Sequence, residues 1–400
     1  MNKDRLLQNA RDHCFFIGLN DSGAELCKAN TVYGMAGIHW VQKKLGLTPN
    51  ATFISTPDMT ITRNTSRWQS GFGYGGKISW GKGDDELVVL NTKPNACGML
   101  VGGLKELPTI GSLIKKAHEM RKSRAEIDGV EIDWNFDKSN HFINLFEVKP
   151  MARIRLKLPS FAFVIHGSGD ELKEDNALTG FGLYYDKSQR LSQKAEKIKT
   201  PFGNFFVLTG SDAGDYFKAY KKAEKFSEEK RRLAAKFLFG NFLEISNKTH
   251  QGLINTNEII LGCHFLSKAK SGLYPLTLRG DLPAYLVRGV PNLTPETVEV
   301  LGFEKRAKRL GVYEKLLSAN IFPHGGGYIL PDILSVNKVI EIEGERYFEV
   351  DMQNDRGKKV ISEVRELPYD YRGRAVALRA LEVGIIKVVA KLIPRFVLKI

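Results

Sequence analysis

The sequence predicts an α+β fold in a single large mixed domain that spans residues 1–400. Short apolar runs, which are typical of strands, dominate the middle of the chain, and longer amphipathic runs, which are typical of helices, lie between them. The two kinds of run do not alternate regularly, as they would around a parallel sheet, so the pattern favours α+β. The chain contains no internal repeat and no low-complexity linker, which favours one domain over several.

Strands are predicted where short apolar or alternating runs occur. Residues 86–92 (ELVVLNT) and 160–165 (SFAFVI) are buried-strand patterns. Residues 152–158 (ARIRLKL) alternate apolar with basic side chains, so the basic face of this strand either faces solvent or offers positive charge to a ligand. Residues 339–351 (VIEIEGERYFEVD) predict a hairpin.

Three amphipathic runs predict helices, at 113–124, 216–239 and 375–392. The second has an apolar stripe opposite a face of mixed charge that includes Lys230 and Arg231, which is typical of a helix with one solvated face. Pro394 is expected to end the third helix, because proline cannot continue it, and a short terminal strand follows.

The glycine-dense segment 71–77 (GFGYGGK) resembles a phosphate-binding turn only superficially. A phosphate-binding turn follows a strand, and no predicted strand leads into this segment. It is therefore predicted to be a flexible lid or a surface loop.

The composition favours an anionic partner. The chain carries 59 lysine and arginine residues against 45 aspartate and glutamate residues, a formal net charge of +14, and nucleic acid or a nucleotide is the simplest match. The four cysteines show no CxxC spacing and the first residues are polar, which predicts free thiols in a reducing cytoplasm. No apolar run approaches the roughly 20 residues of a membrane helix, so no membrane partner is expected.

Five possible metal ligands occur in one recurring context. Each is followed directly by glycine or phenylalanine, and three of them close an apolar run. Thiolate and imidazole are the usual ligands of divalent transition metals, and strand ends are where a fold converges side chains on a site. The pattern predicts a metal centre at converging strand ends, with a hydrogen-bonded core residue as the alternative at each position. The candidates are Cys97, His141, His166, His264 and His324.

Two of these histidines precede glycine-rich segments, HGSG at His166 and HGGG at His324. Free backbone N–H groups there can hold phosphate oxygens, and one histidine could act as a nucleophile that forms a phosphoramidate, although the residues alone do not assign which. His264 is preferred over its neighbour Cys263, because buried free cysteine behaves as a small hydrophobe. The other histidines lie in polar or helix-like segments and are not assigned to the site, His39 being the most typical core residue: His13, His39, His118 and His250.

In their order along the chain, these motifs resemble those of the RtcB-type RNA ligases. The likeness extends from about residue 57 to 399 and lies in spacing and flanking residues. Its parts are TPDM at 56–59, GYGG at 73–76, NACGM around Cys97, NHF at 140–142, IHGSG at 165–169, GCHFLSK around His264, LRGDLPAY at 278–285, PHGGGY at 323–328 and the terminal stretch with Tyr371 and Lys399.

The resemblance implies an RtcB-like catalytic domain that uses Mn²⁺ and GTP and acts on RNA. The implied reaction joins an RNA end with a 3′-phosphate or a 2′,3′-cyclic phosphate to an end with a 5′-hydroxyl. The resemblance implies that His324 is guanylylated by GTP, and that GMP then moves to the 3′-phosphate before the 5′-hydroxyl attacks. The implied Mn²⁺ ligands are Cys97, His141, His166 and His264. The implied GMP pocket contains Asn140, Gly325, Gly326, Tyr371 and Lys399.

The chain departs from the family pattern at several positions. Pro94 replaces an aspartate near the cysteine, Asn144 replaces a glutamate, and Tyr328 replaces an arginine. Thr60 and Phe265 replace a histidine and an asparagine. Two alternatives therefore stay open, namely an RNA-end or nucleotide-binding module without turnover and a metal-dependent phosphoesterase. Whether one or two metals bind, and whether the chain is a monomer or a dimer, also stay open.

Overall fold

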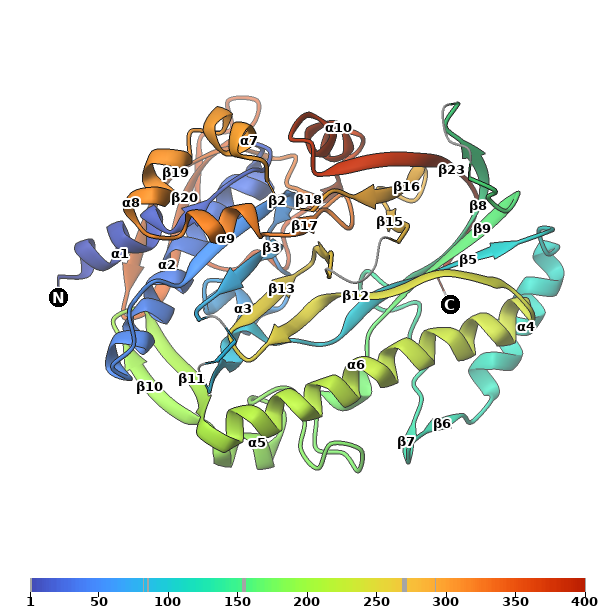
Figure 1. Ribbon diagram of the computed structural model, residues 1–400, viewed down its shortest axis with the longest axis horizontal. Helices are drawn as coiled ribbons and strands as arrows, with labels where there is room; N and C mark the ends of the chain where they lie inside the picture. Colours follow the sequence, from blue (N-terminus) through green and yellow to red (C-terminus); the bar gives the residue numbers. More distant parts are fainter. Residues whose placement is uncertain are drawn as a thin grey trace.

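The computed structural model of the chain describes residues 2–81, 83–84, 86–152, 156–267, 272–291 and 293–399. Its centre is an 11-stranded sheet in which neighbouring strands run antiparallel, except for the parallel pair β1 and β2 (Figure 1). In spatial order the strands are β1 (Cys14–Phe15), β2 (Thr52–Thr60), β3 (Tyr74–Ser79), β13 (Glu258–Leu261), β12 (Leu243–Asn255), β5 (Cys97–Leu104), β9 (Phe161–Gly167), β8 (Phe142–Pro150), β23 (Ile386–Leu398), β16 (Ala284–Gly289) and β15 (Tyr274–Leu276).

Smaller sheets surround the central one. They are β10 (Glu196–Thr200) with β11 (Gly203–Thr209) and β4 (Leu87–Val89), β19 (Ile333–Ile342) with β20 (Glu345–Met352) and β21 (Lys358–Ile361), β14 (His264–Phe265) with β17 (Ile321–Phe322), β18 (Tyr328–Ile329) with β22 (Asp370–Tyr371), and β6 (Glu126–Ile127) with β7 (Val130–Glu131). Large mixed sheets and segregated helices confirm the α+β prediction.

The helices pack around the sheets, and several begin at a residue whose side chain caps the helix. Asp21 caps the buried helix α2 by accepting from the N–H of Ala24 at 3.1 Å. The longest helix, α6, runs along one face of the sheet beside β5 and β12 (Figure 1). The helices are α1 (Lys3–Asp12), α2 (Ser22–Lys44), α3 (Thr65–Gln69), α4 (Ile110–Lys122), α5 (Gln189–Lys194), α6 (Gly210–Phe239), α7 (Pro295–Val300), α8 (Glu304–Arg309), α9 (Tyr313–Leu317) and α10 (Ala375–Glu382). None of the described helices is long and apolar enough to span a bilayer.

Several predicted elements are confirmed. Helix α4 matches the run 113–124, β9 matches 160–165, and the β19–β20 hairpin matches 339–351, turning where Glu343 and Gly344 have positive φ. The run 86–92 is a strand only over β4 and ends in a 3-10 turn. Of the predicted strand 152–158, residues 153–155 lie outside the described residues and 156–158 are not in a strand.

The predicted helix 375–392 is wrong beyond its first two turns. Helix α10 ends at Glu382, and Gly384, whose φ is +75°, turns the chain into the long strand β23. The following residues include a β-branched run, IIKVV, which fits a half-buried sheet better than a helix. The amphipathic pattern misled because β23 also has one buried and one exposed side.

The prediction of a lid at 71–77 is also wrong, because these residues lead into the buried strand β3. At Gly75, φ is +84° and a Cβ atom would lie 2.3 Å from the Cα of Met59. Only glycine allows the two backbones to approach this closely. The glycines therefore serve strand packing and not flexibility.

Helix α6 corrects a third expectation. Lys230 and Arg231, predicted on the solvated face, are buried against the sheet. Lys230 forms an ion pair with Glu171 at 2.7 Å, and Arg231 donates to the carbonyl of Gly167 at 2.9 Å. Their hydrogen bonds offset the cost of burying the two charges. They fix α6 to the end of β9, beside the predicted site.

We predict that Gly252→Ala destabilises the protein by about 1–3 kcal/mol, because the new methyl group overpacks a filled core. A Cβ atom on Gly252 would lie 1.6 Å from the hydroxyl oxygen of Tyr220 on α6. Gly214, also on α6, has open space around it, so Gly214→Ala is expected to be neutral or to add up to about 1 kcal/mol through helix propensity. Urea denaturation of both variants measures the difference. Equal stability of the two variants would contradict the packing.

Candidate active site

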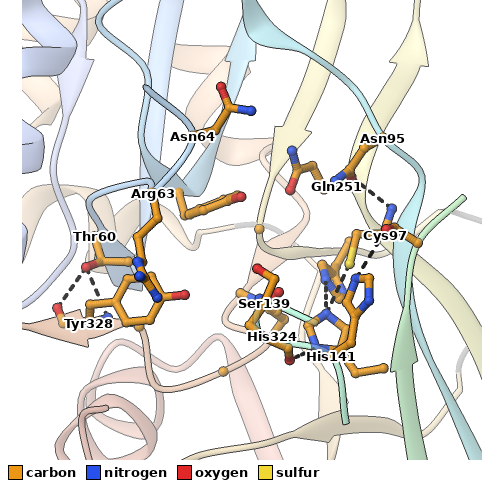
Figure 2. Close-up of a pocket in the computed structure, with 18 of the residues that line it drawn as sticks. Thr60, Arg63, Asn64, Asn95, Cys97, Ser139, His141, Gln251, His324 and Tyr328 are labelled. Atoms are coloured by element: carbon orange, nitrogen blue, oxygen red, sulfur yellow. Dashed lines mark hydrogen bonds between the residues drawn. The ribbon is translucent and has the colours of Figure 1, made fainter. Parts of the chain in front are cut away.

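A pocket of about 660 Å³ opens beside the start of β5, the end of β9 and the middle of β12. Apart from His264, every residue that the sequence assigns to the site lines it. Figure 2 shows Cys97 and His141 on one side, Thr60 and Tyr328 on the other, and His324 and Ser139 between them. Residues from distant parts of the chain therefore meet in one cavity, which is the usual form of a ligand site.

Three possible ligands converge within this pocket, on three neighbouring strands. Cys97 begins β5, His166 lies near the end of β9, and His250 lies on β12. The Sγ atom of Cys97 is 3.1 Å from Nε2 of His166, which is 3.2 Å from Nε2 of His250. All three ligand atoms lie within 4.8 Å of one another and are buried, which is a cluster able to hold a metal ion.

The surroundings of His166 fix its role in this cluster. Its Nδ1 lies 2.8 Å from the carbonyl oxygen of Asn140, which can only accept, so Nδ1 carries the proton. The lone pair of Nε2 then points at Cys97 and His250. Burial lowers the pKa of His166 well below its usual value and raises the pKa of the Cys97 thiol to about 12. A bound cation would displace that thiol proton, as metal–thiolate sites do.

Because His250 lies in a polar segment, the sequence does not predict it as a site residue. The structure corrects this prediction by placing His250 in the ligand cluster. The β12–β5 pairing shifts register between Thr249 and Gln251, so His250 is the extra residue of a bulge. A bulge re-aims a side chain, and here it turns His250 towards the cluster. Sequence periodicity cannot reveal such a residue.

His264, predicted as a metal ligand, lies outside both the cluster and the pocket lining. Its Nε2 donates to the carbonyl oxygen of Pro275 at 2.8 Å, and its ring packs against Tyr274 and Phe322 with centroids 5.1 and 5.2 Å away. Its Nδ1 is buried without a partner among the described residues, and its ring centroid lies 6.1 Å from that of His250 and 6.4 Å from that of His324. The assignment of His264 as a metal ligand therefore stays a prediction. His39 is a buried core histidine, as expected, since its Nε2 donates to the carbonyl oxygen of Ala51.

His141 lies beside the cluster without joining it. Its ring centroid is 5.6 Å from that of His166, but its Nε2 is 3.2 Å from the hydroxyl of Ser168. Ser168 in turn donates to Asp170 at 2.5 Å. Although burial alone would raise the pKa of Asp170, the charge of Lys173 helps to hold it at about 2. The predicted ligand His141 is thus tied into a polar network next to the three converging donors.

His324 is held by a buried carboxylate. Its Nδ1 donates to Oδ2 of Asp58 at 2.8 Å, and the backbone N–H groups of His324 and Gly325 donate to the same oxygen at 3.0 and 3.2 Å. Burial alone would raise the pKa of Asp58, but these hydrogen bonds and one from Thr56 lower it. The proton therefore stays on Nδ1, which leaves the Nε2 lone pair of His324 free to react. Asp58 lies in the TPDM segment, and its contact with His324 is not predicted by the sequence.

The rest of the pocket wall is positively charged and partly aromatic. Seven lysine and arginine side chains line it against two aspartates, Asp170 and Asp186. The ring of Tyr371 lies 5.1 Å from that of Tyr328. The basic side chains are Arg63, Arg67, Lys93, Lys173, Lys187, Arg365 and Lys399. Such a wall is suited to an anionic ligand that carries a planar ring.

We predict that the metal-free protein loses stability as the pH falls from about 6.5 to about 4. Buried histidines have folded pKa values below the unfolded value, so the unfolded chain binds more protons and each contributes about 1.4 kcal/mol per pH unit in that window. Urea denaturation across this range measures the slope, which His39→Asn should reduce and the exposed His118→Asn should not. A flat profile would contradict the burial. The histidines concerned are His39, His141, His166, His250 and His264.

Together the pocket offers a positioned imidazole, a set of soft metal donors and a basic wall. Cys97, His166 and His250 can hold a cation, and His324 can attack an electrophile placed before it. Phosphorus centres are the electrophiles that a basic wall attracts. No protein-family model and no curated protein sequence matches the chain.

Proposed function

We propose that the chain is a metal-dependent RNA ligase of the RtcB type that transfers GMP through His324. The observation that carries this proposal is the pairing of His324 with the buried Asp58 at the edge of an anion-binding pocket. A histidine held in this way can act as a nucleophile, because its Nε2 is left without a hydrogen bond among the described residues. The resemblance in motif order supports GTP as the nucleotide and RNA as the substrate.

In the proposed reaction, Nε2 of His324 attacks the α-phosphorus of GTP. An N–P bond forms, the bond to the bridging oxygen breaks, and pyrophosphate leaves. GMP then passes to an RNA 3′-phosphate, where a phosphoanhydride forms as the N–P bond breaks. A 5′-hydroxyl attacks the activated 3′-phosphorus and gives up its proton to water, GMP leaves, and a phosphodiester remains. Asp58 offsets the positive charge that develops on the imidazole in the first step.

Cys97, His166 and His250 would hold the metal ion, and their geometry fits one. When bound, the ion supplies Lewis-acid polarisation of a phosphoryl oxygen. One thiolate and two imidazoles are soft to intermediate donors that suit Zn²⁺, whereas Mn²⁺ prefers oxygen ligands. The expected Mn²⁺ is therefore part of the proposal, and Zn²⁺ is the competing ion.

The residues proposed for the GMP site come from both sides of the pocket, Tyr371 beside Tyr328 and Lys399 beside His141. Tyr371 offers a ring face, and Lys399 donates to the carbonyl oxygens of Ser139 and His141 at 3.0 and 2.5 Å. Asn140 contributes its carbonyl to His166 and so connects this site to the metal donors. The amide oxygen of Asn144 is buried in the pocket wall without a partner among the described residues, so it can accept from a base N–H.

Incubation with α-labelled GTP and Mn²⁺ or Zn²⁺ tests this proposal. A base-stable, acid-labile label on the protein is expected, since phosphoramidates have that chemistry. The labelled protein should then join an RNA 3′-phosphate end to a 5′-hydroxyl end. Absence of label with either ion, in protein shown to contain metal, would exclude ligation by this route.

A second candidate is a metal-dependent phosphoesterase. Pro94, near Cys97, offers no ligand, and the described ligand cluster contains no carboxylate, so a single ion with a bound water is the simplest occupant. One ion suffices for hydrolysis by metal-activated water. Release of phosphate from 3′-phosphorylated RNA without GTP would favour this candidate over ligation.

A further inference from the structure

Arg67 is the most unusual charge in the pocket wall. It lies on the short helix α3 and is 1% exposed. Its Nη2 donates to the carbonyl oxygen of Lys93 at 2.7 Å, its Nη1 donates to the amide oxygen of Gln251 at 2.7 Å, and its Cζ lies 5.1 Å from the centre of the Tyr74 ring. Its Nε is buried and has no partner in the described part of the chain.

No carboxylate among the described residues forms an ion pair with Arg67, whose hydrogen-bond partners there are the neutral carbonyl of Lys93 and amide of Gln251. Arg372, another buried arginine next to the pocket, does have a carboxylate partner, since its Nη2 donates to Oδ1 of Asp21 at 2.6 Å. A buried cation without a counter-charge is costly unless a bound anion supplies one.

Lys93 places a second buried cation beside Arg67. Its Nζ contacts Asp186 and Ser66 and lies 5.0 Å from the centre of the Tyr184 ring. Burial lowers the pKa of Lys93, and Asp186 opposes that effect. One partly exposed aspartate thus stands against two buried cations on this side of the pocket.

Tyr74 lies between Arg67 and the reactive histidine. Its ring stacks on Arg67, and both Tyr74 and His324 come within 3.3 Å of the position that a Cβ atom on Gly262 would take. In Figure 2, Asn64 and Asn95 lie on the opposite side of the pocket from Ser139 and His324. Arg67 and Lys93 also line the pocket, and neither is among the residues proposed for the GMP site.

We propose that Arg67 and Lys93 form a second phosphate subsite, which holds a phosphate group other than the one that His324 attacks. This inference rests on the proposed function. A guanidinium and an ammonium are matched to phosphate oxygens, and the Nε of Arg67 has no partner among the described residues. The phosphate comes either from the pyrophosphate part of the nucleotide or from the end of the RNA.

Calorimetric titration with three probes tests the subsite: pyrophosphate, an RNA oligonucleotide with a 3′-phosphate, and the same oligonucleotide with a 3′-hydroxyl. Arg67→Gln and Lys93→Gln are each expected to weaken binding of at least one phosphate probe about tenfold or more, as charge-assisted hydrogen bonds do. Arg306→Gln is the matched control. Its guanidinium also stacks on a ring, 4.4 Å from the centre of Phe15, and donates to the carbonyl of Cys14, but it lies outside the pocket.

The pattern of loss identifies the source of the phosphate. Weaker pyrophosphate binding alone assigns the subsite to the nucleotide, and loss of the preference for a 3′-phosphate assigns it to RNA. Unchanged affinity for all three probes in folded Arg67→Gln and Lys93→Gln overturns the inference. If Arg67→Gln does not fold, Lys93→Gln decides. His324→Asn should still bind the phosphate probes, because the subsite does not include His324. Loss of labelling with probe binding intact would therefore count against the proposed function and not against the subsite.

Discussion

Replacing His324 with asparagine is expected to abolish the labelling of the protein by α-labelled GTP, a loss of at least about a thousandfold. Asparagine still offers a donor to Asp58 but has no nucleophilic nitrogen where Nε2 of the imidazole lies. Acid-labile label on the denatured protein measures the effect. Thermal unfolding should be little changed, since His324 lies in the pocket wall, not in the core. Label that persists in this variant would assign the nucleophile elsewhere.

Asp58→Asn tests the same nucleophile through its partner. An asparagine amide can donate to Nδ1, which would move the imidazole proton to Nε2 and remove the reactive lone pair. We expect labelling to slow about a hundredfold or more, with the protein still folded. Asp332→Asn, at an exposed ion pair with Arg356, is the matched control and should label normally. If Asp58→Asn is labelled as fast as the wild-type protein, the carboxylate only holds the backbone of His324 and Gly325 in place.

The second large effect concerns the metal. Cys97→Ala and His250→Gln are each expected to weaken metal binding by more than about a hundredfold, because loss of a direct ligand exceeds the 10–100-fold effect of losing a residue that only orients one. His264→Gln is the matched control, since His264 is equally buried but lies outside the cluster. The metal content of each purified variant, measured by mass spectrometry, gives the result.

The comparison of His250 with His264 is the decisive part of that experiment. The sequence predicts that His264 binds the metal, whereas the structure places His250 beside Cys97 and His166. Metal loss in His264→Gln together with metal retention in His250→Gln would reverse the assignment. Which ion is retained by the wild-type protein would also separate Mn²⁺ from Zn²⁺.

The local sequence pattern correctly predicted that Cys97 and His166 lie at strand ends in the site. Cys97 and His166 stand at the ends of apolar runs, and runs of this kind became neighbouring strands whose ends meet. The α+β class followed from the same patterns. His250 was beyond this reasoning, because a bulge sets its direction and a bulge depends on pairing with another strand.

Long-range partners were equally hidden. Asp58 and His324 are 266 residues apart, and nothing near either residue in the sequence announces their hydrogen bond. Lys230 and Arg231 looked like solvated charges because their partners lie on other elements. Strand β23 looked helical because its pattern of buried residues does not differ sharply from that of a helix face. In each case tertiary contacts override the local pattern.

The position of β23 has a consequence for how the molecule is made. This strand fills the space between β8 and β16 in the sheet (Figure 1), yet it is synthesised after both. Until it emerges, each neighbour exposes an unpaired edge, which is a template for pairing with other chains. Lys399, which follows β23, reaches the pocket at the same moment. Closure of the sheet and completion of the pocket are thus one event, so nascent chains are expected to be aggregation-prone and inactive together.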